Sequence, residues 1–589
     1  MKPMRGSKLL LVTLTVVGVS LVLLGVAIGA VSALQDAPPP STISGIVTNE
    51  DGAVAGAILQ IQGTPTTFQT DENGAFSLSD IDLSSPLVLT AWSAGHFIGW
   101  TTLDPSAADW NGNITISLRT LPNHDNNEYE WFTSDDGLEG SAACGSCHRE
   151  YTEWQADQHS QSATNHRFLT LYTGTDLSGN QSEMTQWGMT GALPRDESEP
   201  YYGPGFMLDN PGRAGSCAAC HTPVASKTPN VQNCAWSGCH TNLTIERARG
   251  LIDRPVLPIN LRGDAAEGIT CEFCHVIGNV VIDPETNRPW PDMPGILSLE
   301  LHRPADESEQ VFFGTLIDVS RPDSYLPLLS ESAFCAGCHY GVFGGVMGDR
   351  TVAGGTLIYN SYGEWLESPY SDPVTGTTCQ GCHMPVSDAD WIVYPESGGI
   401  VRGYSELHNH TMPGASDETL LQNSVTMVSS AAHSGDQLQV QVSITNDRAG
   451  HSVPTDSPLR SMMLVVEALN ANGDVLTLLE GSVNPDYAGE YAGVPGRTFA
   501  KILMDEWTGE FPTAAIWRPL TIVEDTRLPA LATDTTAYTF DLPNGEAATI
   551  NVSLIYRRAF YELMQQKGWN DPDILMEYET IQLADTTHE

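Results

Sequence analysis

All twelve cysteines of this 589-residue chain occur in six pairs, and a histidine follows the second cysteine of every pair. The six motifs are Cys144/Cys147/His148, Cys217/Cys220/His221, Cys234/Cys239/His240, Cys271/Cys274/His275, Cys335/Cys338/His339 and Cys379/Cys382/His383. Five of them have the form C-x-x-C-H, which is the attachment signature of c-type haem. In such a motif the two thiols bind the porphyrin and the histidine binds the iron as proximal ligand. The pattern predicts six haem c groups.

The third motif is stretched, because four residues rather than two separate Cys234 from Cys239. A bulged loop would still let both thiols reach one porphyrin, and the alternatives are a local disulfide or a cysteine pair that holds a loop. We favour haem because His240 follows as in the other five motifs. Zinc fits poorly, since the units do not group into sets of four ligands. A disulfide framework does not require a histidine after each pair.

The chain is strongly acidic, with 72 Asp and Glu against 27 Lys and Arg and a formal net charge of −45. Nucleic acid is therefore not an expected partner, because phosphate contacts require Lys and Arg. The charge is typical of a solvated, self-repelling surface, and it also suits basic redox partner proteins. The length predicts three or four domains.

The N-terminus carries an apolar run at residues 9–34 that is preceded by three basic residues. The run is long enough to span a bilayer and longer than the apolar part of a secretory signal. We therefore expect a signal-anchor transmembrane helix within residues 1–34, with the remaining chain facing the periplasm or the cell exterior. A candidate cleavage site at residues 31–33 leaves a removed signal peptide as the alternative. Residues 35–41 form a Pro-rich linker.

The remaining chain is predicted to hold three domains. Short alternating runs with turn signals predict a small β-sandwich over residues 42–120. Residues 121–419 contain all six motifs, and their many Gly, Pro, Asn and Asp residues predict a loop-rich and α-helical haem domain with little regular structure. Residues 438–445 alternate strictly between apolar and polar side chains, which predicts a C-terminal β-sandwich over residues 420–589. The expected fold class is a transmembrane helix followed by these three domains.

Ten further histidines could supply the second axial ligand that a low-spin haem needs. The distal candidates are His124, His159, His166, His302, His410 and His451. His408 and His410 are two residues apart, so their side chains point in opposite directions in an extended segment and only one is expected to bind iron. His96 and His433 are expected to be structural, and His588 is expected to lie in a mobile tail.

Five runs of this chain resemble multihaem c-type cytochromes, and especially the tetrahaem electron carriers of nitrification. The similar runs are CGSCHREYTEWQADQHSQSA (144–163), GITCEFCHVI (268–277), EWLESPYSDPVTGTTCQGCHMP (364–385), HNHTMPGA (408–415) and NDRAGHSVPTDSPLR (446–460). The resemblance implies that His159, His410 and His451 are distal ligands. The chain departs from the four-haem pattern by its six motifs, so pairings between haems cannot be carried over.

A separate run at residues 43–78, ISGIVTNEDGAVAGAILQIQGTPTTFQTDENGAFSL, resembles the carboxypeptidase regulatory-like domain. That resemblance implies a β-sandwich without chemistry of its own, often a spacer or an adhesion module.

Two functions are compatible with these patterns. Closely packed haems with two histidine ligands each predict electron transfer from the membrane to an extracytoplasmic acceptor. The alternative is a redox enzyme of the nitrite or hydroxylamine type, which needs one iron with an open position. A C-x-x-C-K motif, which marks the catalytic haem of pentahaem nitrite reductases, is absent from the sequence. We therefore expect an electron carrier rather than a catalyst and assign no catalytic residue. A structural surface protein, an oligomer or a filament subunit is a third possibility.

Overall fold

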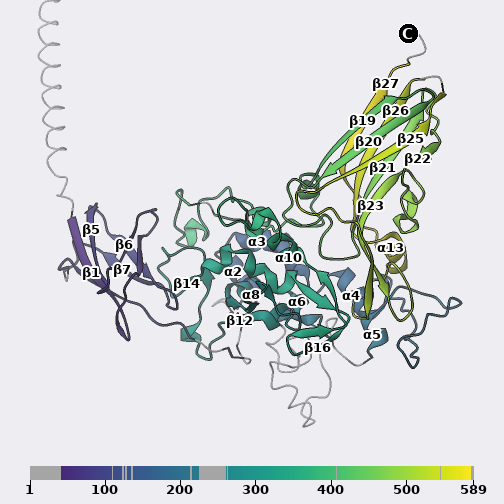
Figure 1. The fold of residues 1–589 in the computed structure, drawn as a ribbon. Helices are drawn as coiled ribbons and strands as arrows, with labels where there is room; N and C mark the ends of the chain where they lie inside the picture. The colour runs from purple at the N-terminus through teal and green to yellow at the C-terminus, as the bar shows by residue number, and fades with distance from the viewer. Residues whose placement is uncertain are drawn as a thin grey trace, which may run out of the picture. The chain divides into compact units, whose positions relative to one another are not determined.

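The computed structural model describes residues 41–585 except for 109, 123–124, 127–128, 130, 134–136, 212–214, 225–260, 262, 406 and 544–545. The predicted transmembrane segment, the stretched motif with Cys234, Cys239 and His240, and the distal candidate His124 therefore lie outside the described residues. The chain divides into two compact units, which are residues 1–120 with 317–322 and residues 121–316 with 323–589. Figure 1 labels the elements of both units.

The smaller unit is a β-sandwich of two four-stranded sheets. One sheet contains β1 (Ser41–Asn49), β2 (Gly52–Ala53), β5 (Ala75–Ile81) and β8 (Asn113–Ser117), and the other contains β3 (Ile58–Ile61), β4 (Thr67–Gln69), β6 (Leu87–Trp92) and β7 (Gly99–Leu103). Strand β1 is antiparallel to β2 and β5 and parallel to β8. The apolar side chains of Val47, Leu59, Leu78 and Leu89 are fully buried in its core. Short strands with one buried face explain the alternation in the sequence.

The C-terminal part of the larger unit is a second β-sandwich. Its four-stranded sheet has the order β19 (Thr426–His433), β20 (Gln437–Thr445), β25 (Thr533–Asp541), β22 (Leu478–Glu480). Its five-stranded sheet has the order β24 (Leu520–Asp525), β23 (Gly496–Asp505), β21 (Ser461–Asn470), β26 (Ala548–Arg557), β27 (Ile574–Leu583).

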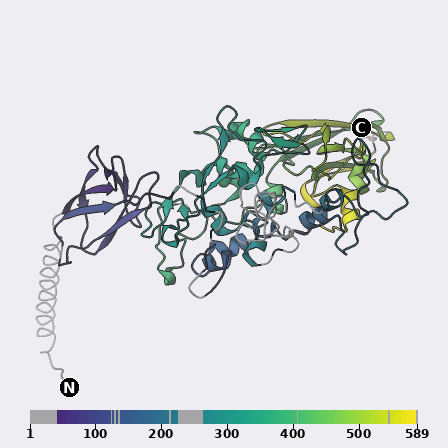
Figure 2. The ribbon, with the colours of Figure 1, turned by 90° about the horizontal axis from the view of Figure 1, so that it is seen from below.

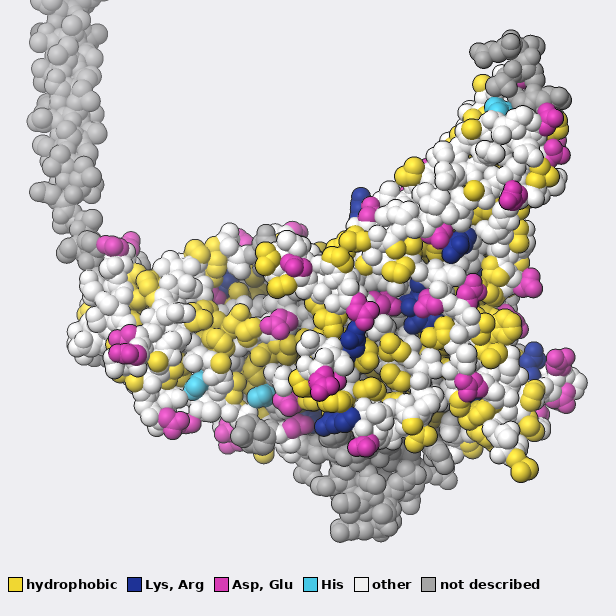
Figure 3. Space-filling view, in the orientation of Figure 1, with side chains coloured by type: hydrophobic (Ala, Val, Ile, Leu, Met, Phe, Trp, Pro, Cys, Tyr) yellow, Lys and Arg dark blue, Asp and Glu magenta, His cyan; other side chains and the backbone are white. Residues whose placement is uncertain are grey.

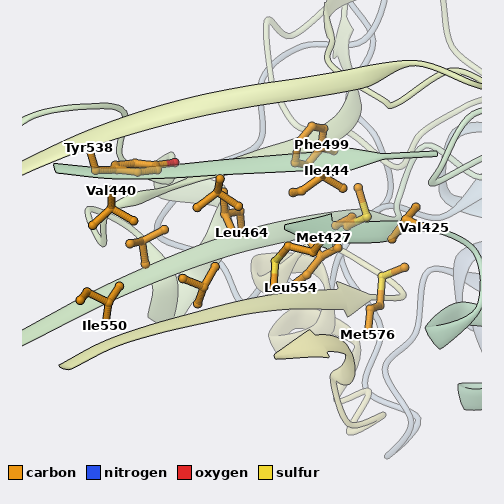
Figure 4. Close-up of a cluster of buried hydrophobic side chains, with 14 of the residues drawn as sticks. Val425, Met427, Val440, Ile444, Leu464, Phe499, Tyr538, Ile550, Leu554 and Met576 are labelled. Carbon is orange, nitrogen blue, oxygen red and sulfur yellow. The ribbon is translucent and has the colours of Figure 1, made fainter. Parts of the chain in front are cut away.

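The core of this second sandwich contains one face of β20. Leu438, Val440, Val442 and Ile444 are buried, as their alternation with polar residues predicted. Figure 4 shows Val440 and Ile444 within the same cluster as Leu464 and other labelled side chains. Each buried aliphatic side chain of this kind contributes roughly 1.5–3 kcal/mol to folding.

The haem-motif region, residues 121–419, consists of short helices and short strands. It belongs to the larger unit except for residues 317–322, which belong to the smaller unit. Its helices are α2 (Ser141–Gly145), α3 (Glu150–Ala156), α4 (His166–Thr173), α5 (Phe206–Asp209), α6 (Ala218–His221), α8 (Cys271–His275), α9 (Ala336–His339), α10 (Ser361–Leu366) and α11 (Cys379–His383). Its paired strands are β9 (Ile277–Val280) with β12 (Leu299–Leu301), β10 (Ile282–Asp283) with β11 (Arg288–Pro289), β13 (Phe313–Gly314) with β14 (Ser324–Tyr325), β15 (Gly341–Phe343) with β18 (Thr356–Tyr359), and β16 (Val346–Gly348) with β17 (Thr351–Ala353). Long connections join these elements in both Figure 1 and Figure 2.

The predicted fold class was wrong in two respects. The haem-motif region is not a loop-rich α domain, because its described part carries five two-stranded sheets beside its short helices. Two- to four-residue strands are too short to leave an alternating pattern, which is why the sequence did not reveal them. The predicted transmembrane helix and the membrane-anchored localisation are also not supported. Across residues 41–585, as far as they are described, no helix is long and apolar enough to cross a membrane. Apolar length alone is a necessary condition for a span and does not establish one.

Buried polar contacts join the haem-motif region to the C-terminal sandwich. The guanidinium of Arg518 donates to Asp209 of α5 through Nε at 2.6 Å and Nη2 at 2.7 Å, and to Asp505 of β23 through Nη1 at 2.6 Å. The Nζ of Lys567, on α13 (Tyr561–Lys567), donates to the carbonyls of Thr170, Thr175 and Pro204 at 3.1, 3.1 and 2.8 Å. These contacts fix the sandwich against α4, α5 and the loops beside them.

The surface in Figure 3 carries scattered acidic side chains, with few Lys and Arg among them. This distribution agrees with the formal charge of −45.

Candidate haem-binding sites

Each of the five described C-x-x-C-H motifs forms a short helical turn, and we name each site by its histidine. Residues three apart lie on one side of a helical turn, so the two cysteines of a motif share a side. The backbone N–H of the histidine donates to the carbonyl of the first cysteine, at 2.9 Å in the His148 site and 3.1 Å in the His221 site. At the His275 and His383 sites the preceding threonine caps the turn, with the hydroxyl of Thr270 or Thr378 accepting from the N–H three residues later. The local geometry suits a two-thiol attachment.

The ten cysteines of the described motifs are free thiols, so none of them forms the disulfide framework that served as the alternative for these motifs. They are Cys144, Cys147, Cys217, Cys220, Cys271, Cys274, Cys335, Cys338, Cys379 and Cys382.

Cys147 is the second thiol of the His148 site. Its Sγ accepts from the hydroxyl of its exposed neighbour Ser146 at 3.7 Å, whereas the thiol of Cys144 contacts Cys271 of another motif. The Ser146 contact is weak, because a thiol sulfur is a poor acceptor, and a thioether bond would replace it. The assignment of Cys147 as a haem-attachment residue stays a prediction from the motif, as it does for the other nine described cysteines.

Three distal candidates lie with their rings beside that of a motif histidine. The ring centroids are 6.3 Å apart for His275 and His410, 6.2 Å for His383 and His451, and 6.3 Å for His339 and His159. The two rings are inclined by 23°, 15° and 66° in the same order. All three distal partners come from segments far from the motif in the sequence.

The separation of these rings matches that of two imidazoles bound to one metal ion. A metal–imidazole nitrogen bond is about 2 Å long. The centre of a five-membered ring lies roughly 1.1–1.2 Å from its nitrogen, given ring bonds of about 1.3–1.4 Å. Two imidazoles on opposite sides of one ion therefore have centroids about 6.3 Å apart. The three histidine pairs fit an iron with two axial imidazoles.

Hydrogen bonds to Nδ1 set the tautomer of four motif histidines. Nδ1 lies 3.0 Å from the Ser162 carbonyl in His221, 2.6 Å from the Phe313 carbonyl in His275, 2.7 Å from the Pro413 carbonyl in His383 and 2.9 Å from the Asp456 carboxylate in His339. A carbonyl or carboxylate oxygen only accepts, so Nδ1 carries the proton. In the neutral ring, Nε2 is then left with its lone pair, as a metal ligand requires.

Two of the distal histidines are held in the same way. Nδ1 of His159 donates to Asp157 at 2.6 Å, and Nδ1 of His451 donates to the carbonyl of Ser452 at 3.0 Å. The third distal histidine, His410, is partly buried, and desolvation of its ring lowers its pKa to about 3. Its ring is therefore neutral at physiological pH, which is the form that binds a metal.

The His339 site is electrostatically different from the others. Burial opposes the charged ring, but the hydrogen bond and the charge of Asp456 raise the pKa of His339 to about 9. Burial also opposes the Asp456 carboxylate, yet the same hydrogen bond and the charge of His339 hold its pKa below the usual range. The pair behaves as an ion pair when no metal is bound.

Thiols of different motifs contact one another. Three pairs of thiols from different motifs are close enough for one thiol to shift the pKa of the other: Cys144 with Cys271, Cys335 with Cys379, and Cys220 with Cys338. The His148 site is thus adjacent to the His275 site, and the His339 site is adjacent to both the His383 and the His221 sites. The His339 site has neighbours on two sides.

Two of these adjacent pairs are built by the same local plan. A serine three residues before one motif accepts from the N–H of the other motif's first cysteine, at 3.1 Å for Ser141 with Cys271 and 2.9 Å for Ser332 with Cys379. A tryptophan indole donates at 2.8 Å to the carbonyl two residues before that cysteine, from Trp154 to Ile269 and from Trp365 to Thr377. The neighbouring glutamates accept backbone N–H groups at the distal histidines, Glu153 from His410 at 2.8 Å and Glu364 from Ser452 at 3.0 Å.

The serine, tryptophan and glutamate residues that support these two pairs of sites were not predicted from the sequence. The pattern that could have revealed them is the run Y-x-E-W, which occurs at residues 151–154 and again at 362–365. A repeated run of this kind before two motifs indicates two similar local structures.

Other predicted ligands are not placed opposite a motif histidine in the described part of the chain. His166 lies beside Asp571 and Trp569, with its Nε2 3.9 Å from the Asp571 carboxylate. His302 packs against the Phe313 ring at 5.0 Å. His408 is exposed, and its Nδ1 is bonded to the Met384 carbonyl, whereas His410 is the member of this pair that faces a motif.

The His221 site has a different neighbour. The ring of Phe168 stacks on the His221 imidazole with centroids 4.0 Å apart and planes within 7°. Tyr172 and Phe206 extend this apolar cluster. Among the residues that the structure describes, no second imidazole lies against His221.

Comparisons with known proteins give little further information. No family model matches the chain, and no curated protein matches it, so the resemblance to the carboxypeptidase regulatory-like domain remains unsupported. A penta-haem cytochrome c552 from Thermochromatium tepidum is similar in structure, with 19% sequence identity and a TM-score of 0.49 over 76% of this chain and 99% of that chain. This similarity by itself establishes neither the fold nor the function.

Two further solved structures match smaller parts of the chain. The Fcho1 Mu homology domain of Danio rerio with a bound Eps15 peptide is 9% identical over 28% of this chain and 44% of that chain, with a TM-score of 0.12. The human CEP192 PapD-like domain 7 is 9% identical over 31% of this chain and 95% of that chain, with a TM-score of 0.13. Neither carries an argument about function.

Proposed function

We propose that the chain is a multihaem c-type cytochrome that transfers electrons along six covalently bound haems, most of them with two histidine ligands. The observation that supports this proposal most directly is the set of three opposed histidine pairs with ring separations of 6.2–6.3 Å. Each pair contains the histidine of a C-x-x-C-H motif, so the thiols and the axial ligands belong to one site. When bound, haem c supplies one-electron exchange at its iron.

The residues of the chain hold these sites close together. Thiols of neighbouring motifs interact electrostatically, so we expect the neighbouring haems to lie close to one another. Backbone carbonyls and carboxylates hold the imidazoles in one orientation, which keeps the ligand set the same before and after an electron is gained. An unchanged ligand set favours a carrier over a catalyst.

The acidic surface suits a basic redox partner. The formal charge of −45 would attract a positively charged donor or acceptor and speed their encounter at low ionic strength. We propose such a protein as the partner, and raising the salt concentration should slow electron exchange with it.

A second candidate function is favoured by the His221 site. Its imidazole is stacked on Phe168 in an apolar cluster, without a second imidazole among the described residues. A site of this kind would leave one iron position open for a small ligand, as a redox enzyme requires.

Two measurements on the full-length holoprotein test these proposals. Intact mass together with a haem-iron assay should give six haems, and a chain without covalent haem would refute the cytochrome. Five haems would remove the stretched motif from the count. Carbon monoxide binding to the reduced protein separates the two functions, because a carrier with six closed irons binds none. Stoichiometric binding of one carbon monoxide, lost in a His221→Ala variant, would favour the enzyme.

A further inference from the structure

The three histidine pairs differ in what holds their Nδ1 atoms. At the His383 site both acceptors are neutral backbone carbonyls, those of Pro413 and Ser452. At the His339 site both acceptors are carboxylates, because His339 donates to Asp456 at 2.9 Å and His159 donates to Asp157 at 2.6 Å. The two sites are neighbours, so this difference separates two adjacent positions of the same array.

Both carboxylates are withdrawn from solvent and held in place. The Asp157 side chain is 4% exposed and the Asp456 side chain is 14% exposed. Asp157 also accepts the backbone N–H of His159 at 2.8 Å. Asp456 uses its second oxygen to accept the N–H groups of Asn360 at 3.1 Å and Ser361 at 3.0 Å. These backbone bonds orient each carboxylate toward its imidazole.

A buried carboxylate that accepts from Nδ1 makes the imidazole a stronger electron donor through Nε2. Carboxylate–histidine–metal arrangements raise the basicity of the ligand in this way, whereas a neutral carbonyl does so less. A more basic ligand favours the oxidised, more positive metal, and the negative charge beside the ring acts in the same direction. Hydrogen bonding to the axial ligand is one of the means by which a protein sets a haem potential.

We propose that Asp456 and Asp157 are positioning residues that make the His339 site the lowest in reduction potential of the three histidine-paired sites. This inference rests on the proposed haem binding. The His339 site adjoins the His383 and the His221 sites through its two cysteines. The hardest to reduce of the three histidine-paired sites therefore lies next to the His383 site, which is easier to reduce.

Redox titration of the holoprotein, followed by optical and electron paramagnetic resonance spectra, tests this inference. Asp456→Asn should raise the midpoint potential of one haem. The amide of Asn carries no negative charge, and its single oxygen cannot accept from both the Nδ1–H of His339 and the backbone N–H groups. Asp157→Asn changes a different segment and should raise the potential of the same haem. It therefore tests the inference even if Asp456→Asn does not fold. The shifted haem is recognised because its signal is lost in His159→Ala.

Asp447→Asn is the matched control, because it removes the same charge from the loop that carries Asp456 while its Oδ2 accepts from the Thr426 hydroxyl rather than from a histidine. The control should leave every potential unchanged, and Asp456→Glu should restore part of the low potential. Unchanged potentials in both aspartate variants, or an equal shift of all haems, would overturn the inference. A protein without haem absorption would instead refute the proposed function.

Discussion

The imidazoles of His383 and His451 lie 6.2 Å apart with their planes within 15° of parallel, although the first belongs to a motif helix and the second to a loop of the C-terminal sandwich. The loop is held against the haem-motif region by Glu364 of α10, whose carboxylate accepts from the N–H of Ser452 at 3.0 Å and from the Thr455 hydroxyl at 3.0 Å. The sandwich therefore completes a site that the motif region cannot complete alone.

Glu364→Ala should loosen His451 and convert part of the His383 haem to a high-spin state. The reason is that the backbone of the His451 loop loses an acceptor that fixes its position. Electron paramagnetic resonance of the oxidised holoprotein measures the high-spin fraction. Glu367→Ala is the control, since this glutamate is exposed and pairs with Arg288 instead. Equal spectra for Glu364→Ala and the wild type would contradict the role of Glu364.

The inclination of the ligand planes predicts two classes of low-spin signal. The rings are closer to perpendicular at the His339 site, at 66°, and closer to parallel at the His275 and His383 sites, at 23° and 15°. The relative orientation of the two planes controls the splitting of the iron d orbitals, so the His339 haem should give the more axial spectrum. Loss of the same signal class in both His159→Ala and His451→Ala would be inconsistent with these angles.

Lys567→Met should destabilise the larger unit by about 2–4 kcal/mol, because three buried carbonyls lose their donor. Lys567 is completely buried, and its Nζ serves the carbonyls of Thr170, Thr175 and Pro204. Urea unfolding followed by circular dichroism measures the change. Gln565→Met, on the exposed side of α13, should stay within about 0.5 kcal/mol of the wild type. A small effect in Lys567→Met would show that water replaces the ammonium group.

Arg518→Met should be more damaging and cost roughly 3–5 kcal/mol, because it leaves the buried carboxylates of Asp209 and Asp505 without their cation. The same urea titration reports the loss. Arg497→Met removes a more exposed ion pair with Asp534 and should cost less than about 1 kcal/mol. Similar losses in the two variants would argue against a special role for the buried network.

The covalent part of the candidate sites could be predicted from local sequence, whereas the pairing of ligands could not. The spacing of C-x-x-C-H determines how its two cysteines are placed, because a helical turn puts residues three apart on one side. The partners His159 and His339 meet only through the folding of distant segments, and no local pattern records that contact. His166 lies beside Asp571 and His302 beside Phe313, and their assignment as distal ligands stays a prediction.

The strands likewise divide into those that could be predicted from local sequence and those that could not. The strict alternation in residues 438–445 identified β20, because one face of that strand is buried along its whole length. The two-residue strands of the haem-motif region have no such face and were missed. Asp456 was overlooked for a related reason, since only the tertiary structure brings its carboxylate to His339.

In the proposed cytochrome, His159, His410 and His451 each close one haem iron. The most direct test is electron paramagnetic resonance of the oxidised holoprotein carrying His159→Ala, His410→Ala and His451→Ala, singly and combined, with His433→Ala as the control. We expect one additional high-spin haem in each single variant, three in the combined variant and none in the control. A combined variant with the spin state of the wild type would contradict the account.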